Sequence, residues 1–227
     1  MADQMKIIAH IRSDFSTKFG IPRQSGLVDS LKATVVFEPE YRVAEALRGL
    51  EGYSHIWLIW KFSEAVREDW SPTVRPPRLG GNTRMGVFAS RSPFRPNPIG
   101  LSSVKLEQIE LDSPDGPVLH ISGADLMDGT PIYDIKPYLP YVDSHPEASG
   151  GFALQQKEGM IGVNCPEELL NRLPADRRQS LLDVLAQDPR PAYQEDAERI
   201  YGMDFAGFEV KFKANEQELT VTHISRK

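Results

Sequence analysis

Short apolar or alternating runs dominate the first 140 residues of the chain. A half-buried strand alternates apolar and polar side chains, whereas a fully buried strand is continuously apolar. The predicted strands are residues 5–11, 31–37, 55–62, 85–89, 101–111 and 118–121. One amphipathic stretch, residues 41–50, predicts a helix because Val43, Ala44, Leu47 and Leu50 fall on one face. Strands without regular intervening helices favour an antiparallel, barrel-like sheet.

The pattern changes after residue 141. Residues 142–158 are small and polar, which is typical of a linker or a surface excursion. Leucines then recur at helical spacing over residues 166–187, and Pro174 divides them into two short helices. Alternating residues on both sides of Asn215 and Glu216 predict a hairpin. We therefore predict a mainly β fold: an antiparallel β-barrel N-terminal domain (1–145), a linker (146–158) and a small α+β C-terminal domain (159–227).

Composition places the chain among globular proteins. It has 227 residues, 40 % of them apolar, and a formal net charge of −6. No apolar run approaches the roughly 20 residues that span a bilayer, and the start of the chain does not have the pattern of a signal peptide. The single cysteine, Cys165, excludes an intrachain disulfide and a thiolate zinc cluster within one chain. We expect a cytoplasmic protein with no membrane segment, and no metal site because the five histidines lack ligand spacing.

Charge is reversed in one segment. Residues 75–100 hold five arginines and no acidic residue, and with Lys105 the window 71–106 carries +6, which leaves −12 for the remainder. Proline and glycine are also dense there, which predicts a rigid loop system and not a helix. The guanidinium group is a planar fork of donors that suits carboxylates and phosphates. The partner of this segment is therefore expected to be anionic, although single arginines could pair with acids on the surface.

A second segment, residues 125–140, is rich in acids and tyrosines. Asp128, Gly129 and Thr130 followed by proline form a turn signal, and a β-turn alone would explain the first two. The alternation after the turn places Asp134 and Lys136 on one strand face. Such a face near an arginine-rich loop suits proton transfer or ligand binding.

Several common cofactor motifs are missing. The sequence contains no GxGxxG after a strand, no GxxxxGK[ST], no HExxH and no GxSxG, which argues against Rossmann and P-loop sites. From the residues alone, three functions stay open. They are an RNA-modifying enzyme, a non-enzymatic RNA-binding module that stacks bases on its aromatic residues, and an enzyme acting on a small anionic metabolite.

Three motifs carry a family resemblance. They are RPPRLGG (75–81), RMGVFASRSPFRPNPIG (84–100) and DGTPIYDIKPYLPY (128–141), with further similarity at 21–24, 49–55 and 184–193. At these motifs the chain resembles the TrmO family, also called TsaA-like or YaeB-like proteins. The resemblance implies a methyltransferase that uses S-adenosylmethionine (SAM) and is built on a β-barrel. It implies transfer to the exocyclic amino nitrogen of N(6)-threonylcarbamoyladenosine at position 37 of threonine tRNA, by a homodimer.

The same resemblance implies a set of cofactor-binding positions. By position in the family's segments these are Pro22, Arg23, Gln24, Ser63, Glu64, Arg91, Asp125, Leu126, Met127, Asp128, Gly129 and Thr130. Ser63 and Glu64 stand where many relatives have His-Gln.

Two further groups of residues are candidates for the chemistry. The accepting nitrogen carries a purine ring and a carbonyl group, so a positioned base should help methyl transfer. We expect Asp134, with Lys136 and Tyr133 beside it, to accept or orient that proton. We expect the substrate phosphates and the threonyl carboxylate to be bound by Arg75, Arg78, Arg84, Arg95 and Asn97.

Overall fold

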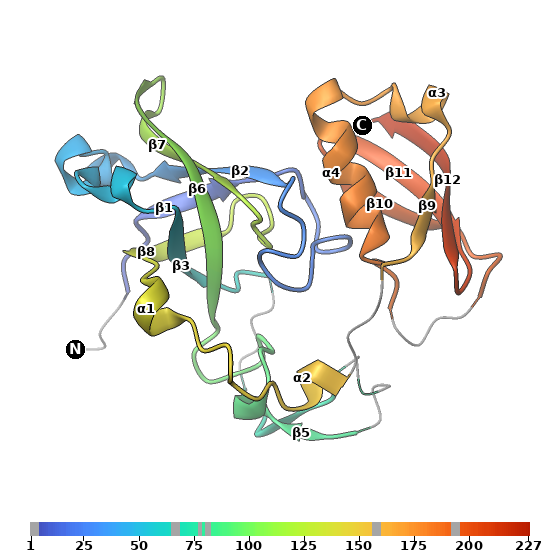
Figure 1. The fold of residues 1–227 in the computed structure, drawn as a ribbon, viewed down its shortest axis with the longest axis horizontal. Helices are drawn as coiled ribbons and strands as arrows, with labels where there is room; N and C mark the ends of the chain where they lie inside the picture. The colour runs from blue at the N-terminus through green and yellow to red at the C-terminus, as the bar shows by residue number, and fades with distance from the viewer. Residues whose placement is uncertain (1–4, 65–68, 77–78, 80–82, 156–159, 192–195) are drawn as a thin grey trace.

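The computed structural model contains two main sheets with separate apolar cores (Figure 1). It describes residues 5–64, 69–76, 79, 83–155, 160–191 and 196–227. The fold is mainly β, with a closed antiparallel barrel followed by a small α+β domain, which confirms the predicted fold class.

Six strands form the barrel in the closed order β1-β2-β7-β6-β3-β8, and every neighbouring pair is antiparallel. The strands are β1 (Ala9–Arg12), β2 (Lys32–Phe37), β3 (His55–Lys61), β6 (Ile99–Ser113), β7 (Gly116–Ser122) and β8 (Pro131–Pro137). Closure of the barrel leaves none of the six strands with an unpaired edge. The predicted strands at residues 31–37 and 55–62 agree with β2 and β3 to within one residue.

Alternation along β3 sorts side chains between the barrel interior and its outer surface. Ile56, Leu58 and Trp60 are buried in the core, whereas the residues between them are partly exposed. Trp60 lies so close to Gly100 of β6 that a Cβ there would come within 2.2 Å of the indole ring. A glycine at this position is therefore what allows the indole to pack against β6.

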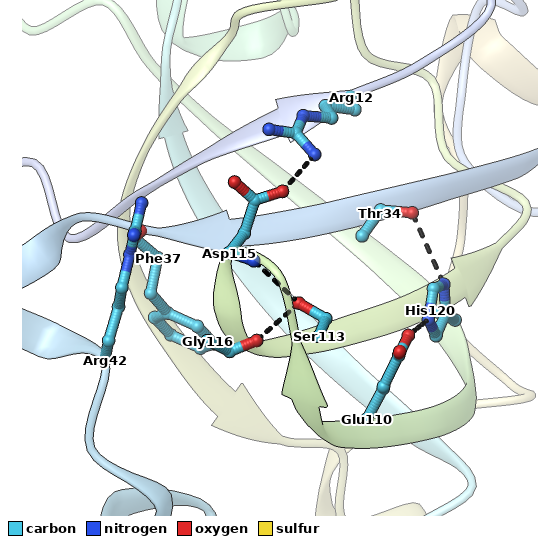
Figure 2. Close-up of polar contacts among 9 residues, drawn as sticks. All are labelled: Arg12, Thr34, Phe37, Arg42, Glu110, Ser113, Asp115, Gly116 and His120. Atoms are coloured by element: carbon cyan, nitrogen blue, oxygen red, sulfur yellow. Dashed lines mark hydrogen bonds and ion pairs between the residues drawn. The ribbon is translucent and has the colours of Figure 1, made fainter.

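Polar contacts join the end of β1 to the β6–β7 hairpin on the barrel surface (Figure 2). Arg12 forms an ion pair of 2.5 Å with Asp115, whose backbone N–H is bonded to the hydroxyl of Ser113. His120 lies 2.8 Å from Glu110 and contacts the Thr34 hydroxyl at 3.4 Å. These contacts fix the register of the barrel at its solvent-exposed rim.

Two sequence predictions in the barrel domain are wrong. Residues 41–50 do not form one helix. The segment is divided among three short 3₁₀ turns, Pro39–Tyr41, Ala44–Leu47 and Leu50–Gly52, with non-helical residues between them. A continuous helix is excluded because the backbone of Val43 is extended, with φ −117° and ψ 109°, and Gly49 has a φ of 89°. The side chain of Val43, on the expected apolar face, is 47 % exposed. The predicted strand 85–89 is only β5 (Met85–Gly86), paired with β4 (Thr73–Val74), and then turns into a 3₁₀ helix.

The C-terminal part of the chain folds into a four-stranded sheet with a helix on one face. The sheet has the order β10-β11-β12-β9, from β10 (Tyr201–Phe205), β11 (Phe208–Ala214), β12 (Glu218–Arg226) and β9 (Gly162–Asn164). The predicted hairpin is β11–β12, and the two predicted helices are α3 (Glu167–Leu170) and α4 (Ala175–Ala186), which begins directly after Pro174. The alternation pattern did not indicate β9 or β10. The described chain between the two sheets contains α1 (Pro140–Asp143) and α2 (Phe152–Gln155).

The long connection between β1 and β2 leaves the barrel and packs against the C-terminal sheet. Phe15, Val28 and Leu31 are buried in the core that α4 and β10–β12 form, and Phe19 and Ile21 pack against that core. In Figure 1 this dark-blue segment reaches from β1 toward the orange α4. We call residues 13–31 the bridging loop.

In the described part of the chain, no helix is long and apolar enough to cross a membrane.

Candidate functional site

A cavity of about 550 Å³ lies where four separate segments of the chain meet. The segments are the bridging loop, the end of β3 with the residues that follow it, the arginine-rich segment, and the turn between β7 and β8. Nine of the twelve predicted cofactor residues line it: Pro22, Arg23, Gln24, Ser63, Glu64, Arg91, Asp125, Met127 and Thr130. We call it the small cavity.

The bridging loop forms one wall of the small cavity. Pro22 is buried, and Gln24 accepts a hydrogen bond from Arg91 across the cavity mouth. Lys18 reaches the carbonyl of Glu64 at 2.8 Å, which ties the same wall to the residues that follow β3. These contacts join residues that are more than 40 positions apart in the sequence.

The β7–β8 turn forms the floor, and some of its predicted cofactor residues hold the turn and do not line the cavity. Leu126 is buried in the barrel core. The carboxylate of Asp128 accepts the backbone N–H of Ser13 at 3.0 Å, and Gly129 has a φ of 76° and donates to Ile11 at 2.9 Å. The β-turn that the sequence indicated here is therefore formed, and it joins the floor to the start of the bridging loop.

Asp125 is the most buried carboxylate that lines the small cavity. Trp60 donates to the Ser102 hydroxyl at 2.9 Å, and that hydroxyl donates to Asp125 at 2.6 Å. Burial raises the pKa of Asp125, and the hydrogen bond from Ser102 and the charge of Arg91 oppose this rise. Asp125 is thus fixed in orientation and suited to a cationic ligand, whose charge would favour its ionised form.

A larger cavity, of about 1620 Å³, adjoins the first. The two share the bridging-loop residues 21–24 and also Arg91. Its other walls are β4 and β5, the start of α2, and residues 187–191 beyond α4. We call it the large cavity; both domains line it.

The predicted substrate-binding residues divide between the two cavities. Arg75 and Arg84 line the large cavity, are exposed, and have no hydrogen-bond or ion-pair partner among the described residues. Arg75 follows and Arg84 precedes the last residue pair of the β4–β5 ladder, Val74 and Met85. The two positive charges therefore lie at the same end of the strand pair. Arg95 and Asn97 line the small cavity, and Arg95 donates to the carbonyl of Ser90 at 3.1 Å. Arg78 lies outside the described residues.

The predicted catalytic group lies elsewhere. Asp134 pairs with Ile59 and Lys136 with Trp57 along β3, and neither side chain lines either cavity. They form an ion pair of 2.9 Å with each other. Tyr133, which is half-buried, is also absent from both linings.

Sequence reasoning missed several residues that shape the site. Trp60 and Ser102 orient Asp125, and Gly100 makes room for the indole. The run of aromatic residues in β3 and the PNPIG sequence before β6 were visible signals, but only the register of β3 on β6 brings them together. The sequence also did not indicate that Trp70 and Phe88 would stack, with ring centroids 6.2 Å apart.

The small cavity can hold a small molecule with charges of both signs, because Asp125 suits a cationic group and Arg91 and Arg95 suit an anionic one. The large cavity beside it, with Arg75 and Arg84, suits a larger anionic molecule. Pockets of a few hundred Å³ with a few fixed polar groups are typical of cofactor sites. Among the described residues, no group of three or more His, Cys, Asp or Glu side chains could hold a metal ion.

Comparison with known proteins gives full-length matches. Residues 10–144 match the family described as tRNA-methyltransferase O N-terminal domain, and residues 163–227 match the TrmO C-terminal domain. A tRNA (adenine(37)-N6)-methyltransferase of Escherichia coli is 42 % identical over 221 residues, 94 % of each chain. One of Eikenella corrodens is 49 % identical over 161 residues, 71 % of this chain and 90 % of its own. The crystal structure of TrmO from Pseudomonas aeruginosa superposes with a TM-score of 0.81 at 35 % identity, covering 100 % of this chain and 98 % of that one.

Proposed function

The chain belongs to the TrmO family, and we propose that its small cavity binds SAM for methyl transfer to adenosine 37 of tRNA. Membership of the family makes it a SAM-dependent tRNA methyltransferase. The observation that carries the site proposal is the small cavity, which gathers nine of the twelve cofactor positions from four distant segments. Its volume of about 550 Å³ suits a molecule of the size of SAM.

Bound SAM would supply an electrophilic methyl group on a sulfonium centre. The ionised carboxylate of Asp125 would face that positive charge, and the bridging loop with the β7–β8 turn would hold the remaining groups. Displacement at a methyl group is in line and depends on positioning, so a pocket braced by prolines and by long-range hydrogen bonds is suited to it.

For the substrate, we propose tRNA with threonylcarbamoyladenosine at position 37, and threonine tRNA in particular. The large cavity opens beside the small one and exposes Arg75 and Arg84, which have no partner in the described part of the chain and suit phosphates and the threonyl carboxylate. Trp70 and Phe88 are 51 % and 74 % exposed and stacked on each other, so a nucleobase can extend their stack. An exposed aromatic pair in the same segment as these exposed arginines favours RNA over a small metabolite.

The base that receives the proton from the accepting nitrogen is a separate proposal. Asp134 is our predicted base, although it lines neither cavity within one chain. Its test is a pair of variants, Asp134→Asn and Asp125→Asn, measured for turnover at saturating SAM and for tRNA affinity. A loss of turnover in Asp134→Asn with unchanged tRNA affinity supports the role. Full turnover in Asp134→Asn removes it, and a loss of turnover at saturating SAM in Asp125→Asn would then assign the role to Asp125, which lines the cavity.

We further propose a cytoplasmic homodimer. Ile99 and Leu101 lie on the outer face of β6, are 36 % and 52 % exposed, and also line the small cavity. A second copy seated on this face would cover both residues and close the cavity. Light scattering on Leu101→Asp, which places a charge on this face, tests the proposal: the variant should be monomeric and the wild type dimeric.

The deciding experiment uses methyl-labelled SAM and two threonine tRNAs, one with and one without the threonylcarbamoyl group. We expect label in the modified adenosine alone, located by nucleoside analysis. Label in both RNAs would keep the methyltransferase but remove the carboxylate-reading role of the arginines. No label in either, with SAM binding intact, would remove this substrate. RNA binding without SAM binding would favour the non-enzymatic RNA-binding module.

A further inference from the structure

The bridging loop has two faces that belong to different parts of the molecule. One face carries residues 21–24, which line both cavities. The other face places Phe15, Val28 and Leu31 in the core of the C-terminal domain, where their exposed fractions are 1 %, 4 % and 3 %. A wall of the proposed SAM site is therefore fixed by a core that lies outside the barrel.

Aromatic packing anchors the first half of this loop. Phe15 meets Phe205 of β10 edge to face at 5.5 Å between ring centroids. Phe19 stacks on Tyr201 and Phe212, each at 6.4 Å. Gly20 lies against Met203, so that a Cβ there would come within 2.0 Å of the sulfur. Phe19 and Gly20 also line the large cavity and directly precede residues 21–24, so this stretch cannot shift without disturbing the C-terminal core.

Polar contacts anchor both ends of the loop to the same domain. The backbone N–H of Ala206 donates to the carbonyl of Asp14 at 2.8 Å, and Arg177 of α4 donates to the Asp14 carboxylate at 3.1 Å. At the other end, the buried Ser180 hydroxyl of α4 donates to the carbonyl of Ser30 at 2.6 Å, and the Ser30 hydroxyl donates to Asp183. Carbonyl partners fix the path of the backbone as well as side-chain positions.

We propose that the C-terminal domain acts as the positioning element of the cofactor site, holding the bridging loop in the conformation that binds SAM. The proposal rests on the assignment of SAM to the small cavity. Two consequences follow from thermodynamic linkage. Loosening the loop at the C-terminal core lowers the affinity for SAM, and SAM in turn stabilises the C-terminal domain although it touches only the barrel side of the loop.

The test compares two truncations in one core. Phe15→Ala removes a loop side chain that lines neither cavity, and Leu219→Ala removes an equally buried side chain on β12 that pairs with β9 and β11. Both variants lose core packing. We expect Phe15→Ala to weaken SAM binding about tenfold, because a loop that samples other conformations is competent only part of the time. Leu219→Ala should bind SAM as the wild type does, at a temperature where both variants are folded.

Binding is measured by calorimetry without RNA, and Phe15→Leu, which keeps an apolar anchor, should restore most of the affinity. Hydrogen exchange gives the reciprocal readout: SAM should slow exchange of amides in α4 and β10. Equal SAM affinity in Phe15→Ala and Leu219→Ala, or protection confined to the barrel, would overturn the proposal. Failure of the wild type to bind SAM would instead contradict the proposed function, so the two failures are distinguishable.

Discussion

The two walls that face each other across the small cavity are held by different means. The bridging loop is fixed by a distant core, with Phe15 and Leu31 buried and Ser30 bonded to α4. The arginine-rich wall is fixed by its own turns, in which Ser90 donates to Val87 at 2.8 Å and Arg95 donates to Ser90 at 3.1 Å. Arg91 and Gln24 connect the two walls.

This difference in anchoring gives the site one rigid side, the bridging loop, and one adaptable side, the arginine-rich segment. A wall packed into a core cannot move without loss of buried apolar contacts, which suits a small ligand that must be held in one orientation. A wall of short local turns, with Phe88 74 % exposed and Arg84 unpaired among the described residues, can adjust its side chains to a large anionic partner. The bridging loop thus suits the cofactor, and the part of the arginine-rich segment that lines the large cavity suits RNA.

A matched pair of glycine substitutions should give the largest difference in stability between the two segments. Gly20 in the loop has a φ of 96° and lies against Met203, whereas Gly86 in the arginine-rich segment, which lines neither cavity, has an ordinary φ of −57° and open space around it. Gly20→Ala should cost about 2 to 4 kcal/mol of folding free energy through backbone strain and overpacking. Gly86→Ala should stay within about 0.5 kcal/mol. Urea unfolding measures both; equal effects would mean that the two segments are held alike.

Asp125→Asn should separate binding from stability. Loss of the carboxylate should weaken SAM binding roughly 10- to 100-fold, the range for a hydrogen-bonded charge. Folding without SAM should not suffer, because burial has already raised the pKa of Asp125 above its ordinary value of 3.8 and disfavours its charge. In the wild type, SAM affinity should fall as the pH drops through that raised pKa, and the variant should lack this dependence. A titration of affinity against pH distinguishes the two proteins.

Arg84→Ala should test whether the arginine-rich segment contacts the phosphates of tRNA. Arg84 lacks a protein partner among the described residues, so its removal should leave folding and SAM affinity unchanged. If it binds a phosphate, the slope of log affinity for tRNA against log salt should decrease in magnitude by about 1. The control is Arg48→Ala, a basic residue that lines neither cavity. An unchanged slope for Arg84→Ala would count against the phosphate contact.

Arg12→Ala should have the smallest effect. The Arg12–Asp115 pair is largely exposed, so its loss should shift the thermal midpoint by no more than about 2 °C. The hydrogen bond from Arg12 lowers the pKa of Asp115 below 3.8, so this small contribution is present above pH 3.8. It is lost as the pH falls through the lowered pKa. Thermal melts of both proteins should therefore converge in acid.

The sequence by itself determined the fold class, and it gave a prediction of which residues form the site. Period-two alternation placed β2 and β3 correctly because burial on one strand face repeats every second residue. Pro174 marked the start of α4, because proline cannot continue the preceding helix. The resemblance supplied the cofactor positions, nine of which meet in one cavity. Helical spacing failed at residues 41–50, where the extended backbone of Val43 and the positive φ of Gly49 interrupt the helix.

Only the tertiary structure decided which of these residues meet and what holds them. The register of β3 on β6 places Gly100 under Trp60, and the hydroxyl of Ser102 then links this indole to Asp125. Nothing in residues 13–31 reveals that their apolar side chains are buried against residues 173–224 of the C-terminal domain. Local pattern records whether a side chain is buried, whereas the partner that buries it depends on how distant segments pack, and this packing sets the geometry of the site.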